Sequence, residues 1–285
     1  KARIFYLRAK GGEPLVLVQT DLLAGSEILH AALSQRLAAV TEIAPQNLVL
    51  TANHTHAAPG QYFGNDFYNK HASNAAGFDP RWFNVLAQRL EGAILLARGQ
   101  LRPAKLAVGQ TDIWQQTRNR SLPAYLNNHE VIDQDASSAR VFKAINPTLT
   151  LVRIDLQDAD GEYRPRGAFS SFSIHGTGIG SDTGFYHADV WAYIANELAW
   201  RVQQQYGLTE KPIHGAFEAT HGDVAPNVKP GQLGFAEARR VGSNIGAQAF
   251  ALFRQLDGQL HDRVQLHSAL REVDVLQQPQ IGTIT

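Results

Sequence analysis

The sequence predicts an α/β protein, in which a layered, mixed β-sheet is flanked by helices. Apolar residues recur with a period of two in some segments and of about 3.6 in others, the periods of strands and helices. The two kinds of segment alternate along most of the chain, as in layered α/β proteins. No internal repeat, low-complexity run or Pro-, Gly- or Ser-rich linker divides the sequence. We therefore expect one domain over residues 1–285.

The first third of the chain should supply three strands and two helices. Short apolar runs predict strands at Ile4–Leu7, Leu15–Gln19 and Leu48–Ala52. A helix should begin near Ser26, because a serine side chain can accept backbone N–H groups there and leucines follow at helical spacing. A second helix is predicted over Pro80–Arg98, where proline is tolerated in the first turn.

The rest of the chain continues this alternation. A turn-forming run, Asp158-Ala159-Asp160-Gly161, separates two apolar runs and predicts a β-hairpin. The predicted strands are Ala104–Ile113, Thr148–Leu156, Ala168–Ile174, Ile213–Ala219 and Val264–Val273, and the predicted helices are Asp189–Gln205 and Phe235–Leu256.

Composition excludes several classes of protein. Basic and acidic residues both number 26, whereas proteins that bind nucleic acid usually carry a basic excess. The chain has no cysteine, which excludes disulfide scaffolds, thiol nucleophiles and cysteine-ligated zinc. The longest apolar runs, such as Ala93–Ala97, are far shorter than the ~20 residues that cross a bilayer. We therefore expect no partner nucleic acid and no transmembrane helix.

Histidines gather at the ends of predicted strands. His54 and His56 are two residues apart and should share a face, His175 ends a strand, and His221 follows another. Strand ends that face one way form the usual ligand crevice of an α/β sheet, so these positions predict one shared site. Imidazoles can bind a metal, or one can bind while another moves a proton, although a lone histidine at a strand end is more often structural.

Other motifs are weaker. The Gly176–Gly180 run lacks the spacing and the downstream acid of a dinucleotide-binding loop. The sequence contains no phosphate loop, no Gly-x-Ser-x-Gly elbow and no His-Glu-x-x-His helix. The polar cluster Arg118–Ser121 is either a solvated loop or a source of a guanidinium for a substrate oxyanion.

Five segments together resemble the neutral/alkaline non-lysosomal ceramidase family, in the family's order. They are Val16–Asp21, Thr51–Gly60 (TANHTHAAPG), Asn119–Asn127 (NRSLPAYLN), Phe172–Thr177 (FSIHGT) and Gly222–Asn227 (GDVAPN). The resemblance implies that residues 1–285 form a ceramidase-like catalytic domain, and that the natural chain extends beyond both ends of this sequence. It also implies a secreted or periplasmic enzyme that meets ceramide or another N-acyl lipid at a membrane surface. The reaction would be zinc-dependent hydrolysis of the amide bond to a sphingoid base and a fatty acid.

The resemblance also assigns roles to residues. His54 and His175 match two of the family's zinc ligands, whereas the other two, a Glu and a Tyr, have no counterpart before Thr285. His56 and Arg120 match positions next to the reacting amide, where His56 would move a proton and Arg120 would stabilise the oxyanion.

The remaining expected site residues are less sharply defined. Asp21 should orient one of the histidines, and Asn119, Tyr125 and Asn227 lie in matching segments where we expect substrate contacts. Ala225 is a departure, because the family has a serine at this position. The missing hydroxyl leaves three alternatives. The protein is a ceramidase that does not need the hydroxyl, or a zinc hydrolase of another amide or ester, or a non-catalytic relative that binds lipids or glycans.

Overall fold

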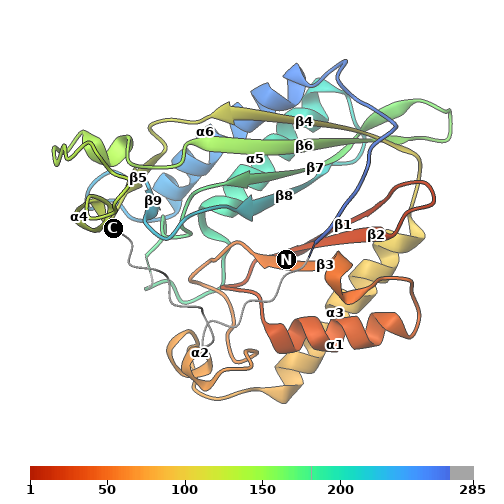
Figure 1. Cartoon of the computed structure of the whole chain (residues 1–285), viewed down its shortest axis with the longest axis horizontal. Coiled ribbons are helices and arrows are strands. Elements are labelled where there is room, and N and C mark those ends of the chain that lie inside the picture. Colours follow the sequence, from red (N-terminus) through yellow and green to blue (C-terminus); the bar gives the residue numbers. More distant parts are fainter. Residues whose placement is uncertain (181, 270–285) are drawn as a thin grey trace.

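A computed structural model describes residues 1–180 and 182–269 (Figure 1). Three sheets contain the nine strands of this described part. The first has the order β1-β2-β3, with β1 and β2 antiparallel and β2 and β3 parallel. The second has the order β4-β6-β7-β8, in which only the pair β7–β8 is parallel. The third is the antiparallel pair β5–β9. The predicted α/β class, with mixed sheets and flanking helices, is therefore confirmed.

The strand bounds agree closely with the sequence-based predictions over most of the chain. They are β1 Ala2–Arg8, β2 Pro14–Thr20, β3 Leu48–Ala52, β4 Ala104–Asp112, β5 Thr117–Asn119, β6 Thr148–Gln157, β7 Tyr163–Phe172, β8 Ile213–Glu218 and β9 Val224–Pro226. The predicted hairpin is β6–β7. The short strands β5 and β9 were not predicted.

One predicted strand is wrong. Of the segment Val264–Val273, residues 264–269 form no strand, and residues 270–273 lie outside the described part of the chain. Just before this segment, His261 makes an isolated bridge to Leu106 of β4. Half-buried residues do alternate with exposed ones at positions 264–267, so the alternation reflects burial on one side and not pairing with another strand.

Four helices cover the two larger sheets. The helix bounds are α1 Glu27–Ala38, α2 Asp66–His71, α3 Pro80–Gly99, α4 Leu122–Tyr125, α5 Asp189–Gln205 and α6 Phe235–Gln255, with 3-10 turns η1 Pro45–Asn47 and η2 Arg140–Phe142. Figure 1 shows α1 and α3 below the three-stranded sheet, and α5 and α6 behind the four-stranded sheet. Ser26 caps α1 as predicted, because its Oγ accepts a hydrogen bond from the Leu29 N–H. No helix in the described residues has the length and apolarity needed to cross a membrane.

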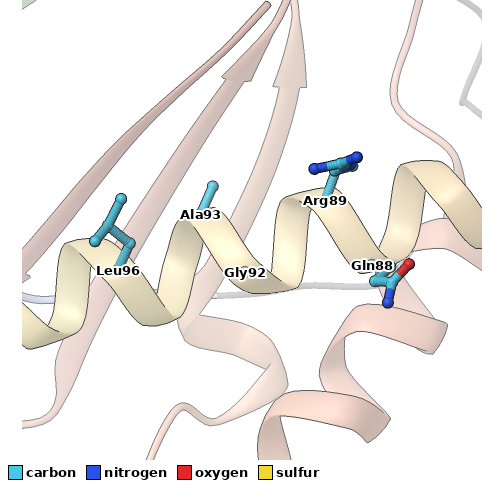
Figure 2. Close-up of a pocket in the computed structure, with 5 residues that line it drawn as sticks. All are labelled: Gln88, Arg89, Gly92, Ala93 and Leu96. Carbon is cyan, nitrogen blue, oxygen red and sulfur yellow. The ribbon is translucent and has the colours of Figure 1, made fainter.

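Each larger sheet has its own apolar core. Val16, Val18 and Ile94 belong to the core between the first sheet and helices α1 and α3, and Leu151 and Trp191 to the core beneath α5 and α6. All five side chains are at most 2% exposed, so most of the hydrophobic stabilisation lies in these two layers. The outer face of α3 carries a hollow lined by that helix alone, at Gln88, Arg89, Gly92, Ala93 and Leu96 (Figure 2).

The two layers meet where β1 lies against β8. Phe5 of β1 packs edge-on against Phe169 of β7, with ring centroids 5.3 Å apart. Gly215 of β8 makes room for it, because a Cβ there would lie 2.6 Å from Phe5 Cε2. A parallel bridge between Thr55 and Gly176 joins the chain beyond β3 to the chain beyond β7. The carboxyl ends of strands from both sheets are thereby brought to one place.

Candidate metal centre

His54 and His56 follow β3, where the chain leaves the first sheet. The backbone of His54 is in the left-handed region, at φ 53°, a conformation that is uncommon for a residue with a side chain. Its ring is fixed by a 2.8 Å hydrogen bond between Nδ1 and the Leu23 carbonyl oxygen. Gly176 lets the neighbouring segment approach closely, because a Cβ there would lie 3.1 Å from the His54 carbonyl oxygen.

His175 and His221 come from the second sheet. His175 lies three residues beyond the end of β7, and its N–H donates to the Val224 carbonyl of β9 at 2.9 Å. Its Nδ1 lies 3.2 Å from the His221 carbonyl oxygen. His221 follows β8, and its own Nδ1 lies 3.0 Å from the Ala219 carbonyl oxygen. Backbone carbonyls therefore orient both rings.

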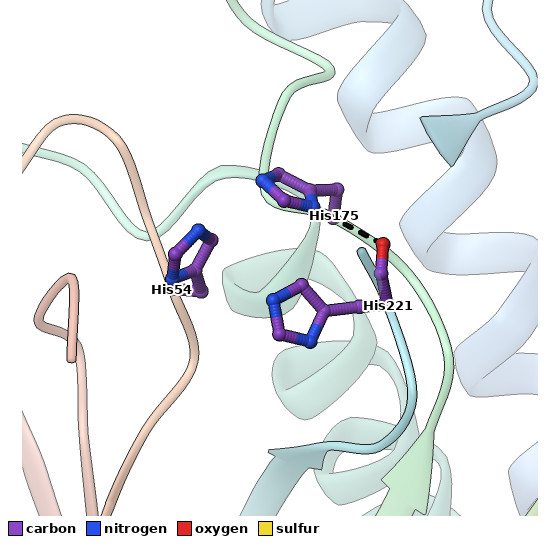
Figure 3. Close-up of side chains that lie close together, drawn as sticks. All are labelled: His54, His175 and His221. Atoms are coloured by element: carbon purple, nitrogen blue, oxygen red, sulfur yellow. Dashed lines mark hydrogen bonds between the residues drawn. The ribbon is translucent and has the colours of Figure 1, made fainter. Parts of the chain in front are cut away.

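Three of these imidazoles form a cluster (Figure 3). Each of His54, His175 and His221 offers one nitrogen, and these atoms lie within 4.8 Å of one another. Because each Nδ1 faces a backbone carbonyl, it carries the proton, and Nε2 is the nitrogen that keeps a lone pair. A hydrogen-bonded Nδ1 with a free Nε2 is the usual state of a metal-binding histidine.

The surroundings of His54, His56 and His175 keep these three rings neutral. Burial, aided by nearby cationic groups, lowers the pKa of His54 to about 4 and that of His175 to about 3. The pKa of His56 is also lowered, chiefly by burial and then by the charge of Arg120. Imidazoles that are neutral near pH 7 bind a metal without first losing a proton.

The donor set fits zinc. Neutral imidazole nitrogens suit zinc and other late transition metals, whereas magnesium and calcium prefer oxygen ligands. A tetrahedral zinc ion with bonds of about 2.1 Å holds its ligand nitrogens ~3.4 Å apart, so small side-chain rotations would close the cluster onto an ion. Three histidines with a free fourth position are typical of catalytic zinc sites.

His56 and Arg120 lie beside the cluster. His56 Nε2 is 3.1 Å from His175 Nε2, and Arg120 Nη2 is 3.5 Å from the same atom. Arg120 is held in place because its Nε and Nη2 both donate to the Gly222 carbonyl, at 3.1 and 2.8 Å. Its backbone N–H donates to Asp223 O at 2.7 Å, which ties the chain after β5 to the chain before β9. A neutral imidazole and a guanidinium thus face the position that a metal would occupy.

Asp21 does not hydrogen-bond to any of the histidines. Its Oδ1 accepts hydrogen bonds from Arg3 at 2.9 Å, from Asn53 at 2.9 Å and from Gln19 at 3.4 Å. The acceptor that orients His54 is a backbone carbonyl and not a carboxylate. Asp21 instead reaches the site through the side chain of Asn53, which precedes His54, so its expected role in orienting a histidine stays a prediction.

Two of the three expected substrate residues have structural partners. The Asn119 side chain is 1% exposed and donates to Ala144 O at 2.8 Å and Asp223 Oδ2 at 2.7 Å. Asn227 donates to the Gln115 carbonyl at 2.8 Å. Asn119 therefore holds the chain next to Arg120, whereas Asn227 ties the chain after β9 to the chain before β5. Tyr125 lies at the end of α4, half-buried.

Sequence reasoning missed one group at this site and left another without a role. His221 was recognised at a strand end, but nothing assigned it as a ligand. Glu218, the last residue of β8, was not singled out at all. Its side chain is 8% exposed, and Oε1 lies 3.3 Å from His221 Nδ1. Burial raises the pKa of Glu218 to about 9. The sequence carries no signal that this carboxylate is buried, because it is the last residue of a strand that also contains His214.

Comparisons with known proteins find relatives that match most of this chain. The neutral ceramidase of Pseudomonas aeruginosa is 28% identical over 286 residues, which cover 98% of this chain and 40% of that protein. The neutral ceramidase of Mycobacterium tuberculosis is 28% identical over 272 residues, or 90% of this chain and 40% of that protein. A crystal structure of the Pseudomonas aeruginosa protein matches 90% of this chain and 39% of its own with a TM-score of 0.71 and 27% identity.

The chain thus spans about two fifths of the length of these relatives. Residues 1–238 match the family described as "Neutral/alkaline non-lysosomal ceramidase, N-terminal". The resemblance seen in the sequence is confirmed, and the chain belongs to the neutral/alkaline non-lysosomal ceramidase family.

Proposed function

We propose that this chain carries the metal centre of a zinc-dependent amidohydrolase that cleaves ceramide or a related N-acyl lipid to a sphingoid base and a fatty acid. The main support is the convergence of three imidazoles beside Arg120 and His56. Membership of a family whose relatives are named neutral ceramidases supplies the substrate class. The secreted or periplasmic location, and the meeting with substrate at a membrane surface, belong to the same proposal.

His54 and His175 would hold the zinc ion. Bound zinc polarises a carbonyl group and lowers the pKa of water, which is the chemistry that amide hydrolysis needs. Arg120 is pinned by its two hydrogen bonds to the Gly222 carbonyl, so its charge is preorganised to stabilise a developing oxyanion. His56 is neutral, because burial lowers its pKa, and can therefore accept a proton and return it to the leaving amine.

Ala225 favours a second candidate. It is 7% exposed on β9, opposite Arg118 of β5, and brings no hydroxyl to the position where the family has a serine. A different amide or ester substrate would account for this change, as would loss of catalysis in a relative that binds lipids or glycans. Asn119 acts in the proposal as a support for Arg120, while Asn227 and Tyr125 keep their predicted role as substrate contacts.

Release of fatty acid from a labelled short-chain ceramide tests the proposal. The full-length protein is assayed loaded with zinc, stripped by a chelator, and reloaded. Activity that disappears on chelation and returns with zinc is expected. A panel of other N-acyl lipids and esters, assayed in parallel, identifies the second candidate if one of them is cleaved and ceramide is not. Zinc-loaded protein that cleaves none of these substrates would contradict the proposed hydrolase.

A matched pair of variants links the activity to the site. His54→Ala should abolish activity, whereas His129→Ala, at an exposed position on the surface, should not change it. Equal activity of the two variants would remove His54 from the site.

A further inference from the structure

We propose that Arg118 makes this a site for anionic N-acyl substrates, in which a carboxylate lies next to the scissile amide, as it does in N-acyl amino acids. This substrate class rests on the proposed amidohydrolase function and refines it. The residues that support it lie on one face of the two-stranded sheet β5–β9 (Figure 1), which carries both Arg118 and Ala225.

The strand pairing places Arg118 and Ala225 together. Arg118 of β5 is directly opposite Ala225 of β9 in this antiparallel pair. Side chains of directly opposite residues project from the same face of a sheet, where they are close enough to interact. Their neighbours Asn119 and Val224 project from the other face, and each of these is 1% exposed. Arg118 is half-buried, so part of its side chain stays open to solvent.

The face that carries Arg118 borders the histidine cluster. Arg120 lies two residues further on, and its N–H donates to the Asp223 carbonyl at 2.7 Å, which continues the β5–β9 pairing by one residue. Alternation along the strand then places the Arg120 side chain on the same face as Arg118. Arg120 Nη2 is 3.5 Å from His175 Nε2. Residues two apart on a strand are separated by about 6–7 Å, a distance that the long Arg118 side chain can span.

The charge of this face is not balanced by carboxylates. Neither Arg118 nor Arg120 forms an ion pair within the part of the chain that the structure describes. The acidic residue of the adjoining segment, Asp223, accepts a hydrogen bond from the Asn119 side chain at 2.7 Å. Ala225 contributes only a methyl group. A neutral substrate would therefore leave the charge of Arg118 unused, whereas a carboxylate would pair with both prongs of its guanidinium.

The two arginines can act on two different groups of one substrate. Arg120 stabilises the oxyanion that develops on the amide carbonyl, and Arg118 holds the carboxylate of the leaving amine. In an N-acyl amino acid a single carbon atom separates the amide nitrogen from that carboxylate, so the two groups are close neighbours. Hydrolysis breaks the C–N bond, with the hydroxyl of water going to the acyl carbon and a proton to the nitrogen. The products are a fatty acid and a free amino acid.

A matched pair of substrates isolates the effect of the carboxylate. N-octanoylglycine carries it, and N-octanoylglycinamide replaces it with a neutral amide of nearly the same shape. Fatty-acid release by the zinc-loaded full-length protein is measured for both compounds and for a short-chain ceramide. We expect kcat/KM for N-octanoylglycine to exceed that for N-octanoylglycinamide about 10–100-fold, mainly through KM, because charge-assisted hydrogen bonds are among the strongest in proteins.

Variants of Arg118 separate recognition of the carboxylate from general structure. Arg118→Gln removes the charge and should bring the ratio of the two kcat/KM values to within about threefold of one, mainly by raising KM for N-octanoylglycine. Arg118→Lys keeps the charge without the planar fork and should retain part of the preference. The exposed control Arg81→Ala should keep the wild-type ratio. Circular dichroism checks that each variant is folded. A purely structural role of Arg118 would lower both kcat/KM values equally and leave their ratio unchanged.

The outcomes distinguish this inference from the proposed function. Equal kcat/KM values of the wild type for N-octanoylglycine and N-octanoylglycinamide would overturn the inference, as would a preference that Arg118→Gln leaves unchanged. Cleavage of the short-chain ceramide in either case would leave the proposed function standing. Zinc-loaded wild-type protein that cleaves none of the three substrates would refute the proposed function and the inference together.

Discussion

The contact between α5 and α6 depends on Gly242, and this gives a prediction whose size can be worked from the structure. A Cβ at Gly242 would lie 2.6 Å from Tyr193 Cβ and 2.6 Å from the Val190 carbonyl oxygen. Gly92 in α3 provides a matched control, because it is also inside a helix but a Cβ there would have no neighbour within 4 Å (Figure 2). The same substitution, glycine to alanine, should therefore have opposite effects at the two positions.

The expected magnitudes follow from two opposing effects. Alanine is better than glycine inside a helix by roughly 0.5–1 kcal/mol, so Gly92→Ala should raise the free energy of unfolding by about that amount. Gly242→Ala gains the same helix propensity. To relieve the close contacts, however, α5 and α6 must move apart by about 1 Å, and such overpacking typically costs ~1–3 kcal/mol. Gly242→Ala should therefore lower the free energy of unfolding by about 1–2 kcal/mol.

Urea unfolding followed by circular dichroism measures both changes. The two variants should differ by roughly 1.5–3 kcal/mol, or about 3–12 °C in thermal midpoint for a protein of this size. If Gly242→Ala is stabilised as much as Gly92→Ala, the close packing of α5 on α6 described here is incorrect.

Three further predictions concern Arg120 and two buried titratable groups, His214 and Asp189. Arg120→Ala should lower kcat about 10–1,000-fold if the charge of Arg120 stabilises the oxyanion. The side chain of Arg81 is 94% exposed, so the control variant Arg81→Ala should leave kcat unchanged. An equal kcat in the two variants would remove Arg120 from the site. Burial lowers the pKa of His214 from 6.5 to about 3. Between these two pH values the unfolded chain binds a proton at this histidine that the folded protein does not bind. The free energy of unfolding should therefore decrease by ~1.4 kcal/mol for each pH unit as the pH is lowered from about 6.5 towards 3. Urea unfolding between pH 7 and 5 should show a shallower pH dependence for His214→Gln than for the wild type, and identical slopes would contradict this. Asp189→Asn should lower the free energy of unfolding by about 1–3 kcal/mol. The buried Asp189 side chain accepts a hydrogen bond from the Ile179 N–H at 2.9 Å, and in asparagine an NH2 group, which is a donor, replaces that accepting oxygen. An unchanged urea midpoint would refute this.

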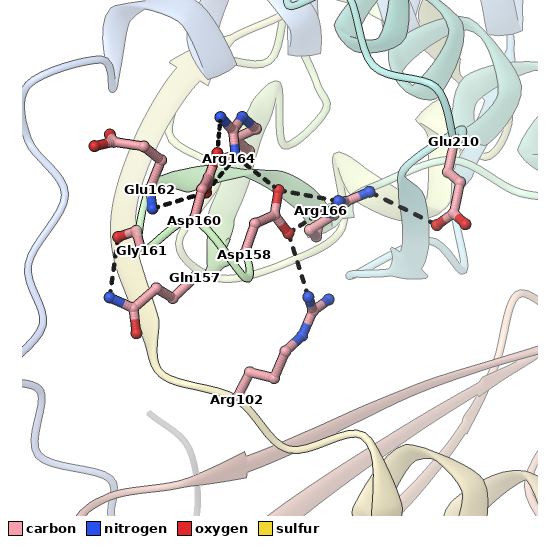
Figure 4. A network of polar contacts seen from close by, with 9 residues as sticks. All are labelled: Arg102, Gln157, Asp158, Asp160, Gly161, Glu162, Arg164, Arg166 and Glu210. Atoms are coloured by element: carbon pink, nitrogen blue, oxygen red, sulfur yellow. Dashed lines mark hydrogen bonds and ion pairs between the residues drawn. The ribbon is translucent and has the colours of Figure 1, made fainter.

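Most elements could be predicted from local sequence patterns. The helix Asp189–Gln205 was predicted with the bounds that the structure has, because its apolar residues keep helical spacing over the whole length. The β6–β7 hairpin was predicted from its turn residues. Figure 4 shows how the turn is held: Asp158 accepts hydrogen bonds from Arg102 at 3.2 Å and Arg166 at 2.9 Å. These contacts reinforce a turn that the local sequence already favours.

The parts that could not be predicted depend on contacts between distant segments. β5 and β9 have three residues each, too few for a periodic pattern, and their pairing brings Thr117–Asn119 against Val224–Pro226. The strand predicted at Val264–Val273 had the right alternation, but residues 264–269 have no pairing partner in the described structure. Alternation reports which side of a segment is buried, and not whether another strand lies beside it.

The site was predictable in outline. Strand-end histidines indicated a shared site, and the family resemblance placed His54, His56, His175 and Arg120 in it; the structure brings these four together. The contact between Glu218 and a histidine was not predictable, because nothing in the sequence indicates that this carboxylate is buried. The prediction that residues 1–285 form one catalytic domain stays a prediction.

Metal content is the most direct test of the central claim that these histidines form a zinc centre. The protein is loaded with zinc, dialysed exhaustively against zinc-free buffer, and analysed for metal by mass spectrometry. The proposed function predicts about one zinc ion per chain in the wild type and none in the double variant His54→Ala/His175→Ala. A wild-type protein without zinc, or a double variant that retains as much zinc as the wild type, would contradict the account.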